Sequence, residues 1–308
     1  MKDVDFMRFQ QLVEPCETMT GNVAVLYAND EKMIAVLVKA LKLTNIDIFI
    51  YDTQDTTEII RSFDLEPQIL NRIHVLTFSS DYQLLKQCSE DLSQGKVTVL
   101  MKGKMKATSM ISFVLSNKNF IDQYGFLNHV ACFSIPNYHK TLMISDVAYN
   151  VAPTIEEKKQ IIKNLTTFSK ALGYDEFNIG LLSSVEQASK KILSSIDAEK
   201  LKNIFNRTSD TDAKIDGPIL FDHAISKKRA IEKNNTSSIA GNVDALLVSN
   251  IDVGSALLKS LTYFGNASVS SLLLGAKFPI VFTSRTESKQ NKLNSLLLAL
   301  KSQNKFNF

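Results

Sequence analysis

Three short polar segments follow apolar runs of the kind that form buried strands. They are residues 102–104 (KGK) after TVLM, 249–250 (SN) after ALLV and 283–285 (TSR) after IVF. In open α/β sheets, ligands bind just beyond the carboxyl ends of the strands. There the guanidinium of Arg285 offers two parallel donors, which suits phosphate or a carbonyl oxygen that gains negative charge. Lysines supply positive charge and Gly103 permits close backbone approach, so the sequence predicts an anion site.

Each of these segments also has a purely structural interpretation. The KGK segment is equally compatible with a solvated basic turn. Capping of the following helix is the favoured interpretation of Asn250. Arg285 is equally compatible with an ion pair to Glu287 at the strand end. Spacing alone leaves these alternatives open.

Most catalytic motifs are absent from the sequence. It contains no GxxxxGK[ST], no GxGxxG, no GxSxG elbow and no HExxH. The three cysteines lack the spacing of a metal site or of a disulfide framework. A catalytic histidine needs an orienting partner, and because the four histidines are isolated in the sequence we expect them to be structural. They are His74, His129, His139 and His223.

The composition is that of an ordinary globular protein. The 308 residues are 44% hydrophobic and 22% charged, which excludes a disordered or fibrous chain. With 35 basic and 32 acidic side chains, the net charge of +3 is too small to indicate a nucleic-acid or membrane surface. No apolar run reaches the roughly 18 residues of a membrane-spanning helix, and the sequence begins without a signal peptide's apolar core. We therefore expect a reduced, cytoplasmic protein that binds neither nucleic acid nor membranes.

The order of apolar and amphipathic runs predicts an α/β protein. Four buried strands alternate with helices in the first part of the chain, which indicates a parallel sheet with helices on both faces. These strands are predicted at 23–27, 46–51, 73–78 and 97–101, and the helices at 30–43, 56–63, 82–92 and from about 106. Asp30 is predicted to cap the first of these helices. A turn at 136–138 then separates two strand runs, 129–135 and 142–145, and predicts an antiparallel hairpin.

The rest of the chain predicts a second α/β unit. Its first helix has acidic residues in the first turn and Gly173 at its end. Segment 206–214 is the most polar stretch and is predicted to be an exposed loop. The other predicted elements are a strand at 179–182, helices between 185 and 205, strands at 215–221 and 245–248, a helix at 254–263, strands at 269–274 and 280–283, and a helix to about 300.

Several longer blocks resemble the phosphate butyryltransferase and phosphate acetyltransferase family. The resemblance covers nearly the whole chain, and DGPILFDHAIS and IVFTSR are closer to the butyryl type. The blocks are LMKG (100–103), ISDVAYNVAPTIEEK (144–158), LLSSVE (181–186), IDGPILFDHAIS (215–226), AGNVDALLVSNIDVGSALLKSLTYFGNA (240–267) and GAKFPIVFTSRTES (275–288).

The resemblance implies a fold of two three-layer αβα domains with a cleft between them, similar to isocitrate and isopropylmalate dehydrogenases. The first domain would comprise residues 1–138 and 280–308, and the second domain, residues 139–279, would be inserted in it. The resemblance also implies that two copies of the protein form a homodimer through the second domain. The implied reaction exchanges the coenzyme A of a short- or branched-chain acyl-coenzyme A for inorganic phosphate. It requires no metal, no tightly bound cofactor and no covalent acyl-enzyme.

The resemblance also implies roles for particular residues. Ser284 would donate to the carbonyl oxygen or the leaving sulfur, and Arg285 would hold phosphate and polarise the carbonyl. Five residues would bind the substrates, the last two of them from the second domain. These are Lys102, Gly103, Thr108, Asn250 and Lys259.

This chain departs from the family pattern at charged positions. After the KG turn, relatives usually carry a Thr/Ser-Asp pair and then an arginine, where this chain has residues 107–109 (ATS) and Ser112. Acetyl-type relatives place an acidic residue seven positions beyond the serine, where this chain has Asn291, with Glu287 as a weak substitute. Two alternatives therefore stay open: a phosphate acetyltransferase, or a catalytically weakened paralogue that binds coenzyme A or acyl phosphate. An oligomeric scaffold is the third and least supported.

Overall fold

The computed structural model describes residues 8–122, 125–208 and 211–303. These residues divide into two compact units. The first unit comprises residues 12–125 and those from 270 onward, and the second comprises residues 126–269 and the segment before Leu12. The division into domains 1–138 with 280–308 and 139–279 stays a prediction. The compact units of the structure change at residues 125–126 and 269–270.

The first unit is built on strands in the order β3-β2-β1-β4-β11-β10. All neighbours are parallel except β10 and β11, which form an antiparallel pair. The central strands β1 and β4 are buried over Val23–Leu26 and Val99–Lys102, as strands covered on both faces require, whereas the edge strand β3 has no buried residue. The strands are β1 (Thr20–Leu26), β2 (Asn45–Asp52), β3 (Ile73–Thr77), β4 (Val99–Lys102), β10 (Ser268–Leu274) and β11 (Ile280–Val281).

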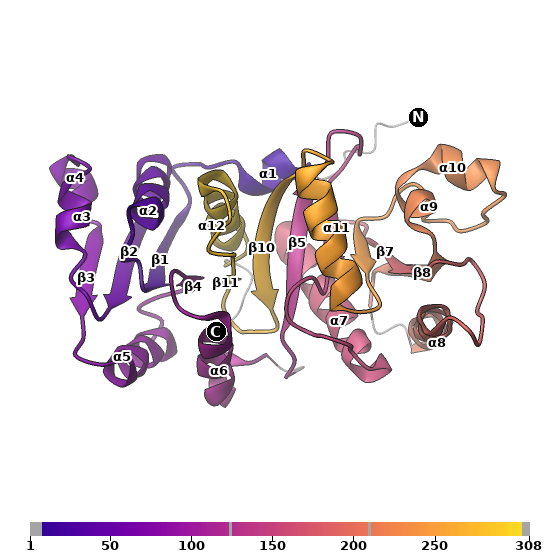
Figure 1. The fold of residues 1–308 in the computed structure, drawn as a ribbon, viewed down its shortest axis with the longest axis horizontal. Helices are drawn as coiled ribbons and strands as arrows, with labels where there is room; N and C mark the ends of the chain where they lie inside the picture. Colours follow the sequence, from indigo (N-terminus) through magenta and orange to yellow (C-terminus); the bar gives the residue numbers. More distant parts are fainter. Residues whose placement is uncertain (1–7, 123–124, 209–210, 304–308) are drawn as a thin grey trace. The chain divides into compact units, whose positions relative to one another are not determined.

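Helices cover both faces of these strands (Figure 1). On one face α2 (Glu31–Leu43) packs against α12 (Lys289–Gln303), and α5 (Asp81–Ser93) and α6 (Ala107–Ser116) lie on the other. The predicted cap of α2 is confirmed, since Asp30 Oδ1 accepts from the Met33 N–H at 2.9 Å. The shorter helices are α1 (Phe9–Val13), α3 (Thr57–Arg61), α4 (Pro67–Leu70) and η1 (Lys118–Phe120).

The second unit has the strand order β5-β6-β9-β7-β8. The predicted hairpin is confirmed as the antiparallel pair of β5 (Asn128–Ser134) and β6 (Leu142–Ser145). The other strands are parallel, and they are β7 (Asn178–Leu182), β8 (Lys214–Ile219) and β9 (Ala245–Leu247).

Helices also lie on both faces of the second unit's strands (Figure 1). Helices α7 (Ile155–Leu172) and α8 (Leu193–Thr208) lie on one face, and α9 (Phe221–Ile225) and α11 (Ile251–Tyr263) on the other, with α10 (Lys227–Glu232) next to α9. Each unit therefore has the three layers that the sequence predicted, and the α/β fold class is confirmed.

The structure corrects several predicted boundaries. One helix, α8, replaces the helices expected between 185 and 205, and it continues to Thr208 into the segment predicted as a loop. Residues 209–210 of that segment lie outside the described residues. The strand predicted at 215–221 ends at Ile219, because Phe221 already begins α9. Helix α11 starts at Ile251 rather than 254, because Asn250 accepts from the Val253 N–H and caps it there.

The three cysteines differ in exposure. Cys88 and Cys132 are buried, and burial raises the pKa of both thiols. Cys16 is exposed, and its hydrogen bond with the Thr18 hydroxyl lowers the pKa of its thiol. All three are free. No helix within the described ranges is long and apolar enough to cross a membrane.

A buried ion pair joins the segment before β6 to that before β9. Lys140 Nζ lies 2.8 Å from Asp244 Oδ1, and both side chains are almost fully buried. Asp244→Ala leaves the ammonium group buried without its carboxylate, so we expect it to lower the free energy of unfolding by about 3–5 kcal/mol. Urea denaturation measures this change.

The matched control is Lys159→Ala, which removes the more exposed pair with Glu156. We expect the control to change the free energy of unfolding by less than about 1 kcal/mol. Equal losses in the two variants would contradict the assignment of a stabilising buried pair.

Candidate functional site

The carboxyl ends of three neighbouring strands meet at one edge of the first unit's sheet. Strand β4 lies between β1 and β11 and runs parallel to both, with Lys102 opposite Leu26 and Met101 opposite Val281. The loops that leave β4 and β11 therefore start side by side. These loops carry the KGK and TSR segments. The structure thus brings together two of the three polar segments that the sequence indicated.

Gly103 lets the KGK segment turn against β1. Its N–H donates to the Leu26 carbonyl oxygen at 2.9 Å, and the Lys104 N–H donates to the Tyr27 carbonyl oxygen at 2.7 Å. A Cβ atom at position 103 would lie only 2.1 Å from that Tyr27 oxygen. Glycine is therefore required here by the packing of the backbone itself.

Arg285 lies against the same turn. Its Nη2 donates a hydrogen bond to the Lys104 carbonyl oxygen at 2.9 Å. Ser284 and Arg285 are both exposed, and the Ser284 hydroxyl lies 3.1 Å from the Thr286 hydroxyl. Among the described residues Arg285 forms no ion pair with Glu287, and Glu287 Oε1 accepts from Asn291 Nδ2 at 2.8 Å. The catalytic pair predicted from the sequence is thus open to solvent.

Lys102 is buried at the base of the turn, with 4% of its surface exposed. Its Nζ donates to the Gly103 carbonyl oxygen at 3.2 Å. Burial, and then the charge of Arg285, lower the pKa of its ammonium group. Both causes disfavour the charged form, so a nearby anion would stabilise it.

A second buried lysine, Lys292, lies in the first turn of α12 and was not predicted. Its Nζ donates to the Ser284 carbonyl oxygen at 2.6 Å and to Thr283 Oγ1 at 3.3 Å. Only 4% of its surface is exposed. Burial and the nearby charge of Lys102 lower the pKa of its ammonium group to about 8.

Lys102, Arg285 and Lys292 form what we call the cationic cluster. The charge of Arg285 lowers the pKa of Lys102, and the charge of Lys102 lowers the pKa of Lys292, so the three groups repel one another. Among the described residues, none of the three forms an ion pair with a carboxylate. Such a cluster suits an anion with more than one negative charge.

The remaining predicted site residues belong to other elements. Thr108 is exposed in the first turn of α6, and within the described ranges its side chain makes no hydrogen bond. Asn250 and Lys259 belong to the second unit. Asn250 caps α11 by accepting from the Val253 N–H at 3.1 Å, as the favoured structural interpretation predicted. Lys259 is exposed on α11.

The helical periodicity around Lys292 indicates that this lysine is buried. Positions 292, 296, 299 and 303 share one face of a helix, and the residues between 293 and 300 are mainly leucine. A lysine on the buried face of such a helix is unusual and marks a position where charge is needed. The position just after a strand, which pointed to Lys102, Gly103, Asn250, Ser284 and Arg285, did not point to Lys292, because Lys292 follows a loop.

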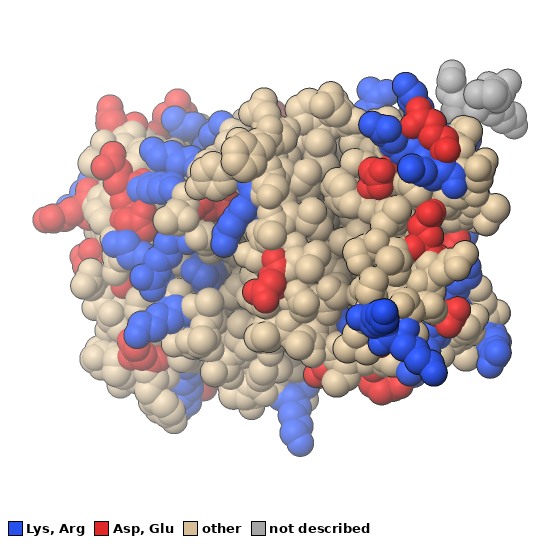
Figure 2. Space-filling view, turned by 45° about the vertical axis from the view of Figure 1, so that its right-hand side comes forward, with Lys and Arg blue, Asp and Glu red and all other residues tan. Residues whose placement is uncertain are grey.

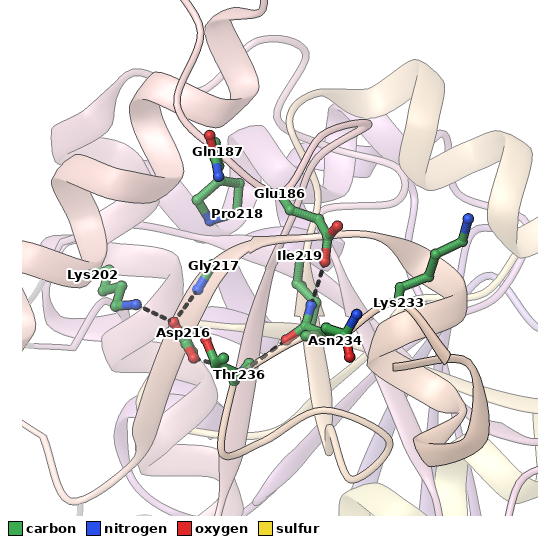
Figure 3. A pocket seen from close by; sticks show the side chains of 12 residues that line it. Glu186, Gln187, Lys202, Asp216, Gly217, Pro218, Ile219, Lys233, Asn234 and Thr236 are labelled. Carbon is green, nitrogen blue, oxygen red and sulfur yellow. Dashed lines mark hydrogen bonds and ion pairs between the residues drawn. The ribbon is translucent and has the colours of Figure 1, made fainter. Parts of the chain in front are cut away.

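A separate cavity of about 410 Å³ lies in the second unit, near β8 (Figure 3). Its charged groups are largely paired: Lys202 Nζ and Ser237 Oγ each lie 2.6 Å from an Asp216 carboxylate oxygen. Glu186 Oε1 accepts from Asn235 and lies 2.9 Å from His223 Nδ1, so His223 has a polar partner. None of the predicted site residues lines this cavity.

In the part of the chain that the structure describes, no three His, Cys, Asp or Glu side chains are grouped as ligands for a metal ion. The groups available at the edge of β4 and β11 are instead ammonium, guanidinium, hydroxyl and backbone N–H donors. This arrangement is able to bind a phosphate-like anion and to stabilise an oxyanion.

Comparison with known proteins gives consistent matches. A family model described as "Phosphate acetyl/butaryl transferase" matches residues 81–300. The chain is 32% identical over 279 residues to "Probable phosphate butyryltransferase" of Bacillus subtilis (strain 168). This match covers 90% of this chain and 92% of the relative. The chain is also 29% identical over 281 residues to "Phosphate acetyltransferase" of Rickettsia felis, in a match that covers 90% of this chain and 79% of the relative.

A solved structure agrees with these matches. The crystal structure of a branched-chain phosphotransacylase from Enterococcus faecalis V583 superimposes with a TM-score of 0.80 and 28% identity, covering 91% of this chain and 98% of that one. The fold and the relatives define an acyltransferase that uses phosphate. Because the family model matches well over half of its length, the chain belongs to the phosphate acetyl/butaryl transferase family, and the resemblance predicted from its motifs is confirmed.

The packing at Gly103 gives a direct test of the site's architecture. Gly103→Ala forces a Cβ atom against the Tyr27 carbonyl oxygen, so the turn has to move away from β1. We expect the free energy of unfolding to fall by about 1–3 kcal/mol, as for other overpacked positions. The control is Ser109→Ala, at an exposed position of α6, which should leave the free energy of unfolding unchanged. Urea denaturation curves that coincide for the two variants would reject the requirement for glycine.

Proposed function

We propose that the protein exchanges the coenzyme A of a short- or branched-chain acyl-coenzyme A for inorganic phosphate, giving acyl phosphate and free coenzyme A. The observation that carries the proposal is the contact of Arg285 with the Lys104 carbonyl oxygen, which joins the TSR and KGK segments. The membership of the phosphate acetyl/butaryl transferase family supports the same reaction. Coenzyme A acts as a substrate, and no tightly bound cofactor is part of the proposal.

The cationic cluster would bind phosphate as the dianion. One phosphate oxygen attacks the thioester carbonyl carbon, and the new carbon–oxygen bond leaves a negative charge on the carbonyl oxygen. The carbon–sulfur bond then breaks, and the thiolate of coenzyme A takes up the proton that the attacking hydrogen phosphate gives up. Holding both substrates together supplies part of the rate enhancement, because the attack becomes effectively intramolecular.

Ser284 and Arg285 would stabilise the charge that develops during this attack. Both side chains are exposed, and the charge of Arg285 acts on the buried Lys102, so the hydroxyl and the guanidinium would be available as donors to the oxyanion. Asn291 stands where acetyl-type relatives place a carboxylate, and its amide is bound to Glu287. The proposal therefore assigns no carboxylate base, and the proton stays with the substrates.

The butyryl-like acyl preference rests on the relatives. One is named a probable phosphate butyryltransferase and one solved structure is a branched-chain phosphotransacylase. Phosphate acetyltransferase activity is the alternative, since relatives of that name match as well. Asn250, Lys259 and Thr108 are proposed as further substrate-binding residues.

We also propose that the protein is a cytoplasmic homodimer. Helix α11 is apolar, yet Gly254 is its one buried residue. At its end Tyr263 is 84% and Phe264 92% exposed. Figure 2 shows a largely uncharged region in the middle of the view, with charged side chains gathered to its left and right. Uncharged surface of this kind is typical of a subunit interface. The three free thiols agree with a reducing compartment.

Removal of the guanidinium tests the proposed reaction. We expect phosphate-dependent release of thiol from butyryl-coenzyme A, and a loss of about 10²–10³ in kcat/KM in Arg285→Ala, because one donor to the transition state is lost. The control is Arg229→Ala, which removes an exposed arginine of α10 that pairs with Glu232. A colorimetric thiol assay measures both variants.

The wild-type protein is assayed in parallel with acetyl-, propionyl-, butyryl- and isobutyryl-coenzyme A. The highest kcat/KM with butyryl- or isobutyryl-coenzyme A is the expected result, and the highest value with acetyl-coenzyme A would favour the alternative. Unchanged turnover in Arg285→Ala would reject the role of Arg285. Calorimetric binding of coenzyme A without turnover of any substrate would favour the paralogue that binds but does not react.

The predicted homodimer is tested at the exposed end of α11. Tyr263→Ser combined with Phe264→Ser removes two large apolar side chains from the surface. We expect the sedimentation coefficient to change from that of a dimer to that of a monomer at micromolar concentration. Tyr82→Ser, an exposed aromatic residue of the first unit, is the control. A variant that sediments like the wild type would remove α11 from the interface.

A further inference from the structure

Lys292 occupies a position that is unfavourable for a lysine. It lies in the first turn of α12, where the helix dipole places partial positive charge, and its side chain is almost fully buried. Buried lysines are rare unless a carboxylate pairs with them. Among the residues that the structure describes, Lys292 has no such partner within ion-pair distance.

The contacts of Lys292 connect it directly to the candidate site. Its Nζ donates at 2.6 Å to the carbonyl oxygen of Ser284, the residue that precedes Arg285. It also donates to Thr283 Oγ1 at 3.3 Å. These two bonds fix the start of the Ser284–Arg285 turn from inside the protein. Because an ammonium group has three N–H donors, one donor of Lys292 is left for another acceptor.

Four charged residues act on Lys292. Burial has the largest effect on its pKa, followed by the positive charges of Lys102 at the end of β4 and Lys32 in α2. Glu287, before α12, and Asp30, before α2, act in the opposite direction but more weakly. The balance lowers the pKa to about 8, so small changes in the local charge decide whether Lys292 is protonated near neutral pH.

We propose that Lys292 is a positioning residue of the phosphate site: its ammonium group fixes the Ser284–Arg285 turn and supplies the charge that selects a dianion, and bound phosphate in turn holds the amine protonated. This inference rests on the proposed function, because that function supplies phosphate as the anion. It adds a residue from α12 to the residues of the strand-end loops, and it gives the site a dependence on pH.

The direction of the pH dependence follows from linkage. Below about pH 8 Lys292 is an ammonium group, and above it the amine becomes neutral. Because bound phosphate favours the ammonium form of Lys292, protonation of Lys292 must strengthen phosphate binding by the same factor. Phosphate affinity therefore falls as the pH rises through about 8. Raising the pH converts more of the inorganic phosphate into the dianion, so its own ionisation would strengthen binding and does not produce the fall.

The test is calorimetric binding of inorganic phosphate between about pH 7 and pH 9.5, with KM for phosphate measured alongside. In the wild type we expect affinity to fall about tenfold or more across this range. Lys292→Met should bind about tenfold more weakly already at neutral pH, with a flatter profile. Lys292→Arg keeps its charge throughout, so its affinity should stay near the wild-type neutral value up to the alkaline end.

The control is Lys289→Met, which removes an exposed lysine from the same helical turn. We expect it to retain the wild-type profile. Wild-type affinity in Lys292→Met, or weaker affinity with an unchanged pH profile, would overturn the inference, since the second result fits a purely structural role. If circular dichroism shows that Lys292→Met does not fold, the profile of Lys292→Arg decides alone.

Failure of this inference and failure of the proposed function give different results. A wild-type protein that binds phosphate with the expected pH profile but releases no thiol rejects the acyl transfer and retains the role of Lys292. The opposite result is normal thiol release together with a pH profile of phosphate affinity that is the same in Lys292→Arg as in the wild type. That result retains the acyl transfer and rejects the role of Lys292.

Discussion

Repulsion between like charges is the constraint on which the candidate site depends. Lys102, Arg285 and Lys292 gather at one edge of a sheet, and the two lysines are buried. Desolvation and mutual repulsion both oppose this arrangement. It persists because α12 buries a row of leucines against the sheet and so holds Lys292 in place. The rest of the fold stabilises a cluster that is unfavourable until an anion binds.

Backbone carbonyl groups, rather than carboxylates, are the partners of these cations. Lys102 donates to the Gly103 oxygen, Arg285 to the Lys104 oxygen and Lys292 to the Ser284 oxygen. A carbonyl dipole satisfies a donor without neutralising its charge, whereas a carboxylate would compete with the substrate. The turns after β4 and β11 are therefore both the ligand-binding loops and the support that orients the charged side chains. This double use explains why the backbone at Gly103 is packed so closely.

The sequence predicted the fold well because buried parallel strands and capped helices leave strong local patterns. The hairpin of β5 and β6 and the cap of α2 at Asp30 were both evident from local residue types. Ser284, Arg285, Lys102 and Gly103 were predicted because they follow strands. Lys292 was not, because its role depends on which residues α12 faces after folding. Likewise, the start of α11 depended on whether the Asn250 side chain was used as a cap.

The three thiols have a practical consequence for any experiment that counts released coenzyme A. Cys88 and Cys132 are enclosed and hold their protons tightly, so an aromatic disulfide reagent reaches neither in the native state. Cys16 is open to the reagent and ionises more easily. The folded chain should thus contribute one fast equivalent of colour, and any signal beyond it comes from substrate or from unfolded protein. The same stoichiometry provides a simple titration of how much of a preparation is native.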